Sequence, residues 1–294
     1  MKFPKIITLF FASAVCFTSL LLAEEHPETP SEPVSGDIMV TVGDPGNKPY
    51  LRKDYELWGT PVELGKVDHT YKIGKYEVTV GDWHAFLWAV ASLPDSHNKV
   101  DAYGLWNEDM LDWITPWGGS IENGEYHLNY MIKNALFSAL PITHVSLYST
   151  LFYMNWKEHG SPILEAGADI DAILKHGAYE FVELDKSLED GAINAAIVPN
   201  EKSHFYLPSQ DEWIKAAYYN ANKFGGWYSL YPTQHDDNPG NNHGDVTNQA
   251  NYDSRSWFSD PLSNPLKKQL TSVYFFSESH SYYGCYDMGG NVNE

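Results

Sequence analysis

Three segments of the chain place apolar residues at the spacing of a helix buried on one face. They lie at residues 77–91, 141–156 and 205–220. Thr79, Ser146 and Ser209 stand where each helix would begin and can cap it, and Glu212 follows Ser209 at capping-box spacing. The inward-facing positions are Trp83, Phe86, Leu87 and Val90; Leu147, Leu151 and Met154; and Trp213, Ala216 and Ala217. The pattern predicts three short amphipathic helices packed on a core.

Two further segments alternate apolar and polar residues, which is typical of strands buried on one face. The first, residues 39–50, is interrupted by the turn sequence DPGN at 44–47, and the second covers residues 67–76. Long stretches without periodicity follow, notably residues 233–272, which are rich in Asn, Asp, Gly and Pro. Loops of that length are usually functional or held in place, for example by a bound cation. The whole pattern predicts an irregular α+β domain.

Residues 1–23 have the composition of a cleaved secretory signal. Lys2 and Lys5 precede an apolar run that ends at the small residue Ala23. An uncleaved anchor is the alternative, because the run is near the lower limit of a membrane span. Residues 24–37 are acidic and Pro-rich, so we expect a linker there and an ordered domain at 38–294. With no other apolar run long enough to cross a membrane, we expect a secreted, periplasmic or cell-envelope protein without a transmembrane segment after cleavage.

Charge and cysteine content narrow the function classes. The formal charge of −20 becomes −22 once Lys2 and Lys5 are removed, which counts against nucleic-acid binding because phosphate backbones are repelled. Cleavage leaves a single cysteine, Cys285, so an internal disulfide is excluded. Stability must therefore come from a core, for which 10 Trp, 20 Tyr and 13 Phe supply ample apolar surface.

Five segments, in this order, resemble the sulfatase-modifying-factor domain, the family of the formylglycine-generating enzyme. They are YKIGKYEVTVGDWHAFL (71–87), PITHVSLYSTLFYMNW (141–156), FYLPSQDEWIKAAYY (205–219), NQANYD (248–253) and YYGCYDMGGNVNE (282–294). The resemblance runs from about Met39 to Glu294 and is strongest to an exported bacterial branch. It implies the complex C-type-lectin-like α+β fold, which is poor in regular secondary structure.

The activity that this resemblance implies is an oxidation in a target protein. The family's archetype is an oxidoreductase that converts a cysteine of a sulfatase to formylglycine with molecular oxygen and a copper ion held by two cysteines. An exported protein or peptide would be the partner. Calcium ions brace the loops of the family.

The resemblance also carries calcium ligands onto this chain. The family's calcium run matches residues 286–294, and a second site matches the sequence ANYD at 250–253, with further ligands expected within 260–268. The implied ligands are Asp287, the carbonyls of Gly290 and Val292, and Glu294 for the first site, and Asn251 with the carbonyl of Tyr252 for the second. Calcium prefers such hard oxygen ligands. Turns held by Asx hydrogen bonds, without a metal, are the alternative.

No catalytic residue can be assigned. The family's two copper-binding cysteines lie downstream of the Gly-Asn-Val-x-Glu run, beside an Arg-Gly-Gly-Ser segment, and this chain stops before them. The C-terminal part of the domain is thus expected to be missing, and these 294 residues alone are expected to be inactive. Cys285 cannot replace the pair, because Cu(I) thiolate ligation needs a partner, and we interpret it as a small buried residue. Asn293 departs from the family's tryptophan on the wall of the substrate groove.

Two other functions remain open. The first alternative is a non-catalytic lectin-like module that binds a protein or glycan. The second is a relative of the iron-dependent sulfoxide synthases, but the additional helical domain and iron-binding histidines of that group are not found in the sequence. A loop cluster of acidic and histidine residues is interpreted as a solvated turn, because its spacing does not suit a transition metal. Its members are His235, Asp236, Asp237, His243 and Asp245.

Overall fold

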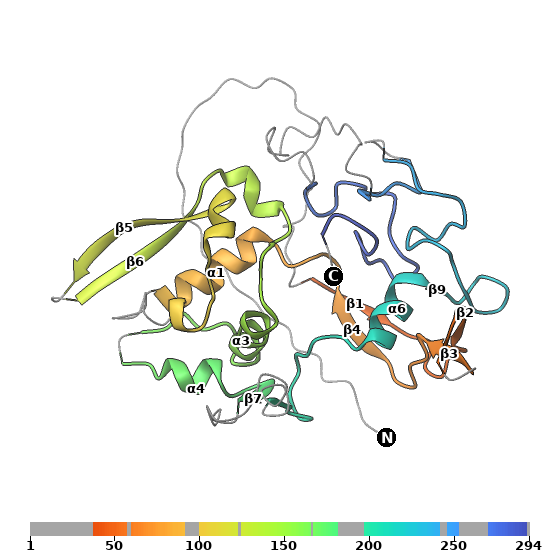
Figure 1. Cartoon of the computed structure of the whole chain (residues 1–294), viewed down its shortest axis with the longest axis horizontal. Helices are drawn as coiled ribbons and strands as arrows, with labels where there is room; N and C mark the ends of the chain where they lie inside the picture. The colour runs from red at the N-terminus through yellow and green to blue at the C-terminus, as the bar shows by residue number, and fades with distance from the viewer. Residues whose placement is uncertain are drawn as a thin grey trace. The chain divides into compact units, whose positions relative to one another are not determined.

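A computed structural model describes residues 38–57, 60–91, 100–122, 125–165, 167–181, 197–241, 246–252 and 270–292 (Figure 1). The expected signal sequence and linker lie outside these residues. Within the described part, short helices and small sheets alternate with long segments that have neither. This mixture confirms the α+β class.

The strands of the described part pair two by two into antiparallel sheets. β1 pairs with β4, with Val40 opposite Ile73 and Val42 opposite Tyr71. The pairs are β1 (Met39–Val42) with β4 (Tyr71–Gly74), β2 (Tyr50–Leu57) with β3 (Thr60–Leu64), β5 (Ile114–Glu122) with β6 (Glu125–Ile132), β7 (Tyr179–Phe181) with β8 (Ile197–Pro199), and β9 (Tyr219–Asn220) with β10 (Trp227–Tyr228). β1 and β4 confirm the two segments predicted from alternating polarity.

Three helices match the predicted ones, and their ends follow the expected capping chemistry. Thr79 and Ser146 each accept a hydrogen bond from the backbone amide three residues later. At Ser209 the capping box is complete, because the Oε2 atom of Glu212 also accepts from the Ser209 amide at 2.8 Å. These three are α1 (Val80–Ala91), α3 (Leu147–Glu158) and α6 (Gln210–Tyr218). The described part also contains the short helix α4 (Ile170–Leu174), which was not predicted, and the 3-10 turns η1 (Glu108–Asp112) and η2 (Ala135–Ala139). No helix of the described part is long and apolar enough to cross a membrane.

Of the three α3 positions predicted to face inward, Leu151 is buried and Met154 packs partly buried against the core, but Leu147 does not. Leu147 was expected to face inward, but it is 55% exposed. The face that is buried carries Phe152, Tyr153 and Trp156. These aromatic side chains remove more apolar surface from water than a leucine in the first turn, so they decide how the helix is rotated.

The largest core cluster joins α1 and α3. The ring of Trp83 stacks on that of Tyr153 at 5.4 Å between centroids, and Phe86 meets Tyr153 edge to face. All four residues predicted to face inward from α1 are buried: Trp83, Phe86, Leu87 and Val90. The helical periodicity therefore identified the α1 side of the core correctly.

A second cluster joins the first strand of the described part to the last segment. Ala216 and Ala217 of α6 pack against Val42 of β1 and against Cys285 and Met288. Cys285 is 1% exposed, which confirms its interpretation as a small buried residue. The small alanines allow α6 to approach the sheet closely.

Lys215 of α6 is buried beside this cluster, which the sequence pattern did not predict. Its Nζ atom donates to the carbonyl oxygen of Asp44 at 2.9 Å. Burial lowers the pKa of the Lys215 ammonium, and the charges of Asp44 and Asp68 oppose that effect. The contact holds α6 against the turn that follows β1.

Candidate functional site

The site that the sequence predicts is centred on the turn at residues 287–292. Asp287, Gly290 and Asn291 all have positive φ, at 55°, 134° and 64°. The amide of Val292 donates to the carbonyl of Gly290 at 2.8 Å, which tightens the end of the turn. Before the turn, the amide of Tyr286 donates to the carbonyl of Lys75 at 2.9 Å. The turn is therefore tied to the loop that follows β4.

Asp287 carries the carboxylate of this turn. Its Oδ2 atom accepts one hydrogen bond, from the amide of Tyr274 at 3.2 Å. Burial raises the pKa of Asp287 to about 6, and this hydrogen bond only partly offsets that effect. Removal of a carboxylate from water makes its charged form costly. A bound cation would remove that cost.

Asn251 lies directly against the same turn. The amide of Asn291 donates to the Asn251 carbonyl at 2.7 Å, and the Nδ2 atom of Asn251 donates to the Oδ1 atom of Asn291 at 3.1 Å. A Cβ atom at Gly290 would lie 2.2 Å from the Asn251 carbonyl oxygen, so only glycine fits there. The structure thus brings together Asn251 and Gly290, which the resemblance assigns to two different calcium sites.

Within the described residues, the Asn291 side chain bonds to residues of three other segments. Its Nδ2 atom donates to Glu77 Oε2 at 2.8 Å and to the Thr271 carbonyl at 3.0 Å. Its Oδ1 atom accepts from the Thr271 amide at 2.9 Å. Asn291 and Thr271 lie near predicted ligands in the sequence, but Glu77 is 214 residues from Asn291, and no sequence pattern predicted their contact. This network of hydrogen bonds around Asn291 therefore depends on the tertiary fold.

Of the remaining predicted ligands, Tyr252 and Val292 are described by the structure and the others are not. Tyr252 is 54% exposed, and its hydroxyl donates to the carbonyl of Pro239 at 2.7 Å. Val292 is half-buried at the end of the turn. The predicted ligand Glu294 and the stretch 260–268 lie outside the described residues, and so does Asn293, which was singled out for the substrate groove and not as a ligand.

The loop cluster around Asp236 is held by hydrogen bonds within the loop. Asp236 Oδ1 accepts from the Leu230 amide at 2.9 Å and pairs with Lys223. The hydrogen bond from Lys223, followed by that from the Leu230 amide, lowers the pKa of Asp236. These bonds give Asp236 a structural role in a turn, and His243 and Asp245 lie outside the described residues.

The donor set of the 287–292 turn fits calcium better than a transition metal. It offers a carboxylate and main-chain carbonyls, which are the hard oxygens that calcium prefers. Among the described residues, no cluster of three or more His, Cys, Asp and Glu side chains could hold a metal. A cation here would thus depend on Asp287 together with carbonyl oxygens.

Copper, by contrast, does not fit the residues present. A Cu(I) site needs two thiolates, and the described part of the chain has Cys285 alone, at 1% exposed and enclosed by Val42 and Ala216. No oxidation step is therefore assigned to these residues.

Comparison with known proteins places the chain in a family. A family model described as the sulfatase-modifying factor enzyme 1-like domain matches residues 23–294. Neither the curated proteins nor the solved structures include a match. Because the family model covers nearly the whole sequence, the chain belongs to the sulfatase-modifying factor enzyme 1-like family.

Proposed function

We propose that this chain forms the calcium-braced scaffold of an oxidoreductase that converts a cysteine of an exported target polypeptide, a sulfatase, to formylglycine. The observation that carries the proposal is the match of residues 23–294 to the sulfatase-modifying factor family. The fold alone would not specify an activity. In such an enzyme, molecular oxygen is the oxidant and copper the metal, and Cys285, the one cysteine of the described residues, does not supply a pair of thiols for it.

The scaffold's own contribution is to fix the turn at residues 287–292. The Asn251–Asn291 bonds and the Tyr286–Lys75 bond tie this turn to distant parts of the chain. A calcium ion held by Asp287 and the carbonyls of Gly290 and Val292 would neutralise the buried carboxylate. The ion would thereby hold the turn in the conformation that these hydrogen bonds favour.

The catalytic part of the proposal is tested by the gene sequence and by a peptide assay. We expect two cysteines a few residues apart to be encoded downstream of codon 294, and a longer product that contains them to convert a cysteine peptide with copper and oxygen. Residues 24–294 alone should give no formylglycine in mass spectrometry. Conversion by residues 24–294, or a downstream sequence without the cysteine pair, would overturn the proposal.

The calcium part is tested separately by thermal unfolding of residues 24–294. Calcium that binds only the folded chain stabilises it by about 2.7 kcal/mol when its concentration is 100 times the dissociation constant. Asp287→Asn should abolish this stabilisation. Asp236→Asn is the matched control, because Asp236 lies in a loop and pairs with Lys223. Equal stabilisation of both variants would exclude Asp287 as a ligand.

A further inference from the structure

A cavity of about 460 Å³ lies between α1, the C-terminal half of α3 and the segment that follows α3. Its volume falls in the range of ligand sites. No residue of the 287–292 turn lines it, so the cavity shares no residue with the candidate calcium site. The chemistry of its own wall therefore decides what could bind there.

Two polar side chains of the wall are held by partners within the fold. Asp82 Oδ2 accepts from the amide and the hydroxyl of Thr79 at 2.9 and 2.7 Å. The Nε2 atom of His84 lies 2.9 Å from the carbonyl oxygen of Tyr130. A carbonyl can only accept, so this nitrogen carries the hydrogen and donates it. The carboxylate and the imidazole are thus part of the structure of α1 and its surroundings.

The α3 side of the wall is arranged in the same way. The Lys157 Nζ atom lies 5.7 Å from the Trp156 ring centroid and 6.0 Å from that of Tyr153. The indole nitrogen of Trp156 donates to the carbonyl of Pro162 at 2.9 Å. One carboxylate, one ammonium and one histidine counted as neutral line the cavity, and their charges cancel. The wall therefore gives a charged ligand no net attraction.

The capacity that remains is apolar surface. Tyr153 and Trp156 are 3% and 5% exposed and belong to the core cluster beneath the cavity, whereas Trp88 and Ile163 are 45% and 71% exposed. An uncharged group that covers these side chains removes apolar area from water and leaves the polar contacts of the wall in place. An aromatic ring is favoured over an aliphatic group, because its face also attracts the nearby Lys157 ammonium.

The segment after α3 adds main-chain groups that suit a polypeptide. The amide of Ser161 donates to the Trp156 carbonyl at 3.0 Å. Within the described residues, the amide and the carbonyl of Ile163 have no hydrogen-bond partner. Extended peptides bind where accessible main-chain groups lie beside a pocket for a side chain. The wall therefore fits a ring that is carried by a peptide backbone.

We propose that the cavity between α1 and α3 binds an uncharged aromatic side chain of an extended polypeptide, with Trp88 against the ring and the main chain of Ile163 bonded to the peptide backbone. The proposal does not rest on the proposed oxidoreductase function, because the peptide needs no cysteine and the cavity shares no residue with the 287–292 turn.

The test is a fluorine NMR titration of residues 24–294 with the probe N-acetyl-Gly-Phe-Gly-amide, fluorinated on its ring. We expect a dissociation constant on the order of 1 mM. Unlabelled peptides with Ala or Glu in place of Phe should compete at least about tenfold more weakly than the Phe peptide, because they leave the apolar wall uncovered. Benzyl alcohol, a ring without a peptide backbone, should also compete more weakly than the Phe peptide.

Two variants of α1 change the cavity in opposite ways. Trp88→Ala removes the exposed indole and should weaken binding at least about fivefold. Ala85→Gln places a longer side chain at an exposed position that lines the cavity, and it should weaken binding several-fold at an unchanged melting temperature, since glutamine is a good helix former. Trp227→Ala is the matched control, because Trp227 is 40% exposed on β10 and does not line the cavity, and it should bind as the wild type does.

Four results would overturn the proposal. They are no binding of the Phe peptide at about 10 mM, equal competition by the Ala or Glu peptide, wild-type affinity in both Trp88→Ala and Ala85→Gln, and competition by benzyl alcohol as strong as that of the Phe peptide. The last result would show that the cavity recognises the ring without the backbone.

Discussion

Asn251 and Asn291, 40 residues apart, exchange two hydrogen bonds, one from the backbone amide of Asn291 and one from the side-chain amide of Asn251. The pair joins a loop to the turn that carries the predicted calcium ligands. Because Asn291 also bonds Glu77 and Thr271, its side chain ties three separate segments together.

Replacement of Asn291 tests how much these hydrogen bonds stabilise the fold. Asn291→Gly keeps the positive φ available but leaves Glu77 Oε2 and the Thr271 amide without this partner. Each buried polar group that loses its partner costs about 1–3 kcal/mol, so we expect the free energy of unfolding in urea to fall by at least about 2 kcal/mol. Phe224→Gly is the control, because Phe224 also has a positive φ, 49°, yet is 88% exposed. Equal losses in both variants would contradict the role of the Asn291 side chain.

Gly290 tests the close approach to Asn251. Gly290→Ala should destabilise the fold by more than about 3 kcal/mol, because its Cβ atom would overlap the Asn251 carbonyl oxygen and the backbone strain adds to that. Gly104→Ala is the matched control: its φ is also positive, at 60°, but a Cβ atom there meets nothing within 4 Å. It should lose only about 1 kcal/mol, and chemical unfolding of the two variants measures the difference. A similar loss in both would show that the overlap is relieved.

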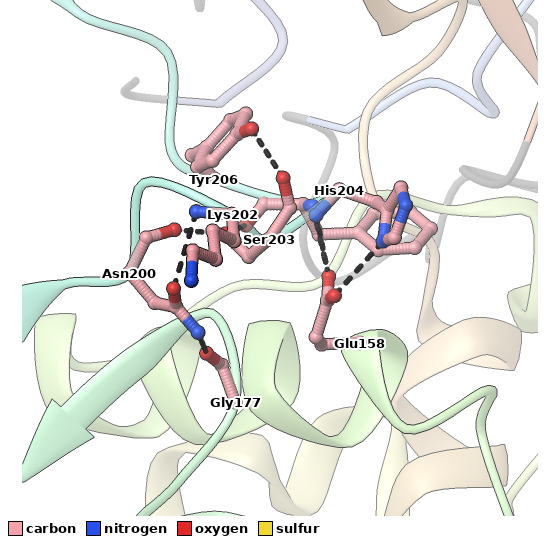
Figure 2. A network of polar contacts seen from close by, with 8 residues as sticks. Glu158, Gly177, Asn200, Lys202, Ser203, His204 and Tyr206 are labelled. Atoms are coloured by element: carbon pink, nitrogen blue, oxygen red, sulfur yellow. Dashed lines mark hydrogen bonds and ion pairs between the residues drawn. The ribbon is translucent and has the colours of Figure 1, made fainter. Parts of the chain in front are cut away.

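The Glu158 carboxylate at the end of α3 links this helix to the segment at residues 204–205 (Figure 2). Its Oε2 atom accepts from the backbone amides of His204 and Phe205 at 2.7 and 3.2 Å, and its Oε1 atom lies 2.9 Å from the His204 ring nitrogen Nδ1. Glu158→Ala should destabilise the chain by about 1–3 kcal/mol, because two backbone amides lose their acceptor. Glu158→Gln keeps one oxygen and should lose less. Glu165→Gln is the control in the same denaturant titration, because Glu165 is exposed. If it lowered the free energy of unfolding as much as Glu158→Ala does, the link between Glu158 and residues 204–205 would not explain the loss.

The lowered pKa of Glu212 should make the stability of the fold depend on pH. Burial by itself would raise the pKa of Glu212, but hydrogen bonds from Ser209 and from His69 outweigh it and hold the pKa below its ordinary value. A carboxyl with a lowered folded-state pKa stabilises the fold above its unfolded pKa, about 4.3, and that contribution is lost as the pH falls through the folded value. Between about pH 5 and pH 3, where a carboxyl group titrates, the free energy of unfolding of the wild type should therefore fall more than that of Glu212→Gln. Parallel stability curves would contradict this.

The parts of the structure that could be predicted are those set by neighbouring residues. The caps at Ser146 and Ser209 and the buried face of α1 depend on side chains within one or two turns, so the sequence pattern identified them correctly. The position of Leu147 was predicted wrongly, because the rotation of α3 is decided by burial of its own aromatic residues, such as Tyr153, which stacks on Trp83 of α1.

The candidate site shows the same division between local and distant information. The turn residues Asp287 and Gly290 were found through a contiguous motif. Glu77 and the contact between Asn251 and Gly290 were missed, because no spacing rule connects residues that only the completed fold brings together. Burial of Lys215 was missed for the same reason, since its partner Asp44 is 171 residues away.

The packing of β1 against α6 and residues 285–288 also sets the order in which the chain can complete its fold. Val42 lies in the first strand of the described part, whereas Cys285 and Met288 lie in its last segment. A ribosome makes the chain from the N-terminus, so β4 can pair with β1 early, but α6 and residues 285–288, which complete the burial of Val42, are made much later. A chaperone that holds the early strands would act on this interval, and a pause in translation before codon 285 would prolong it.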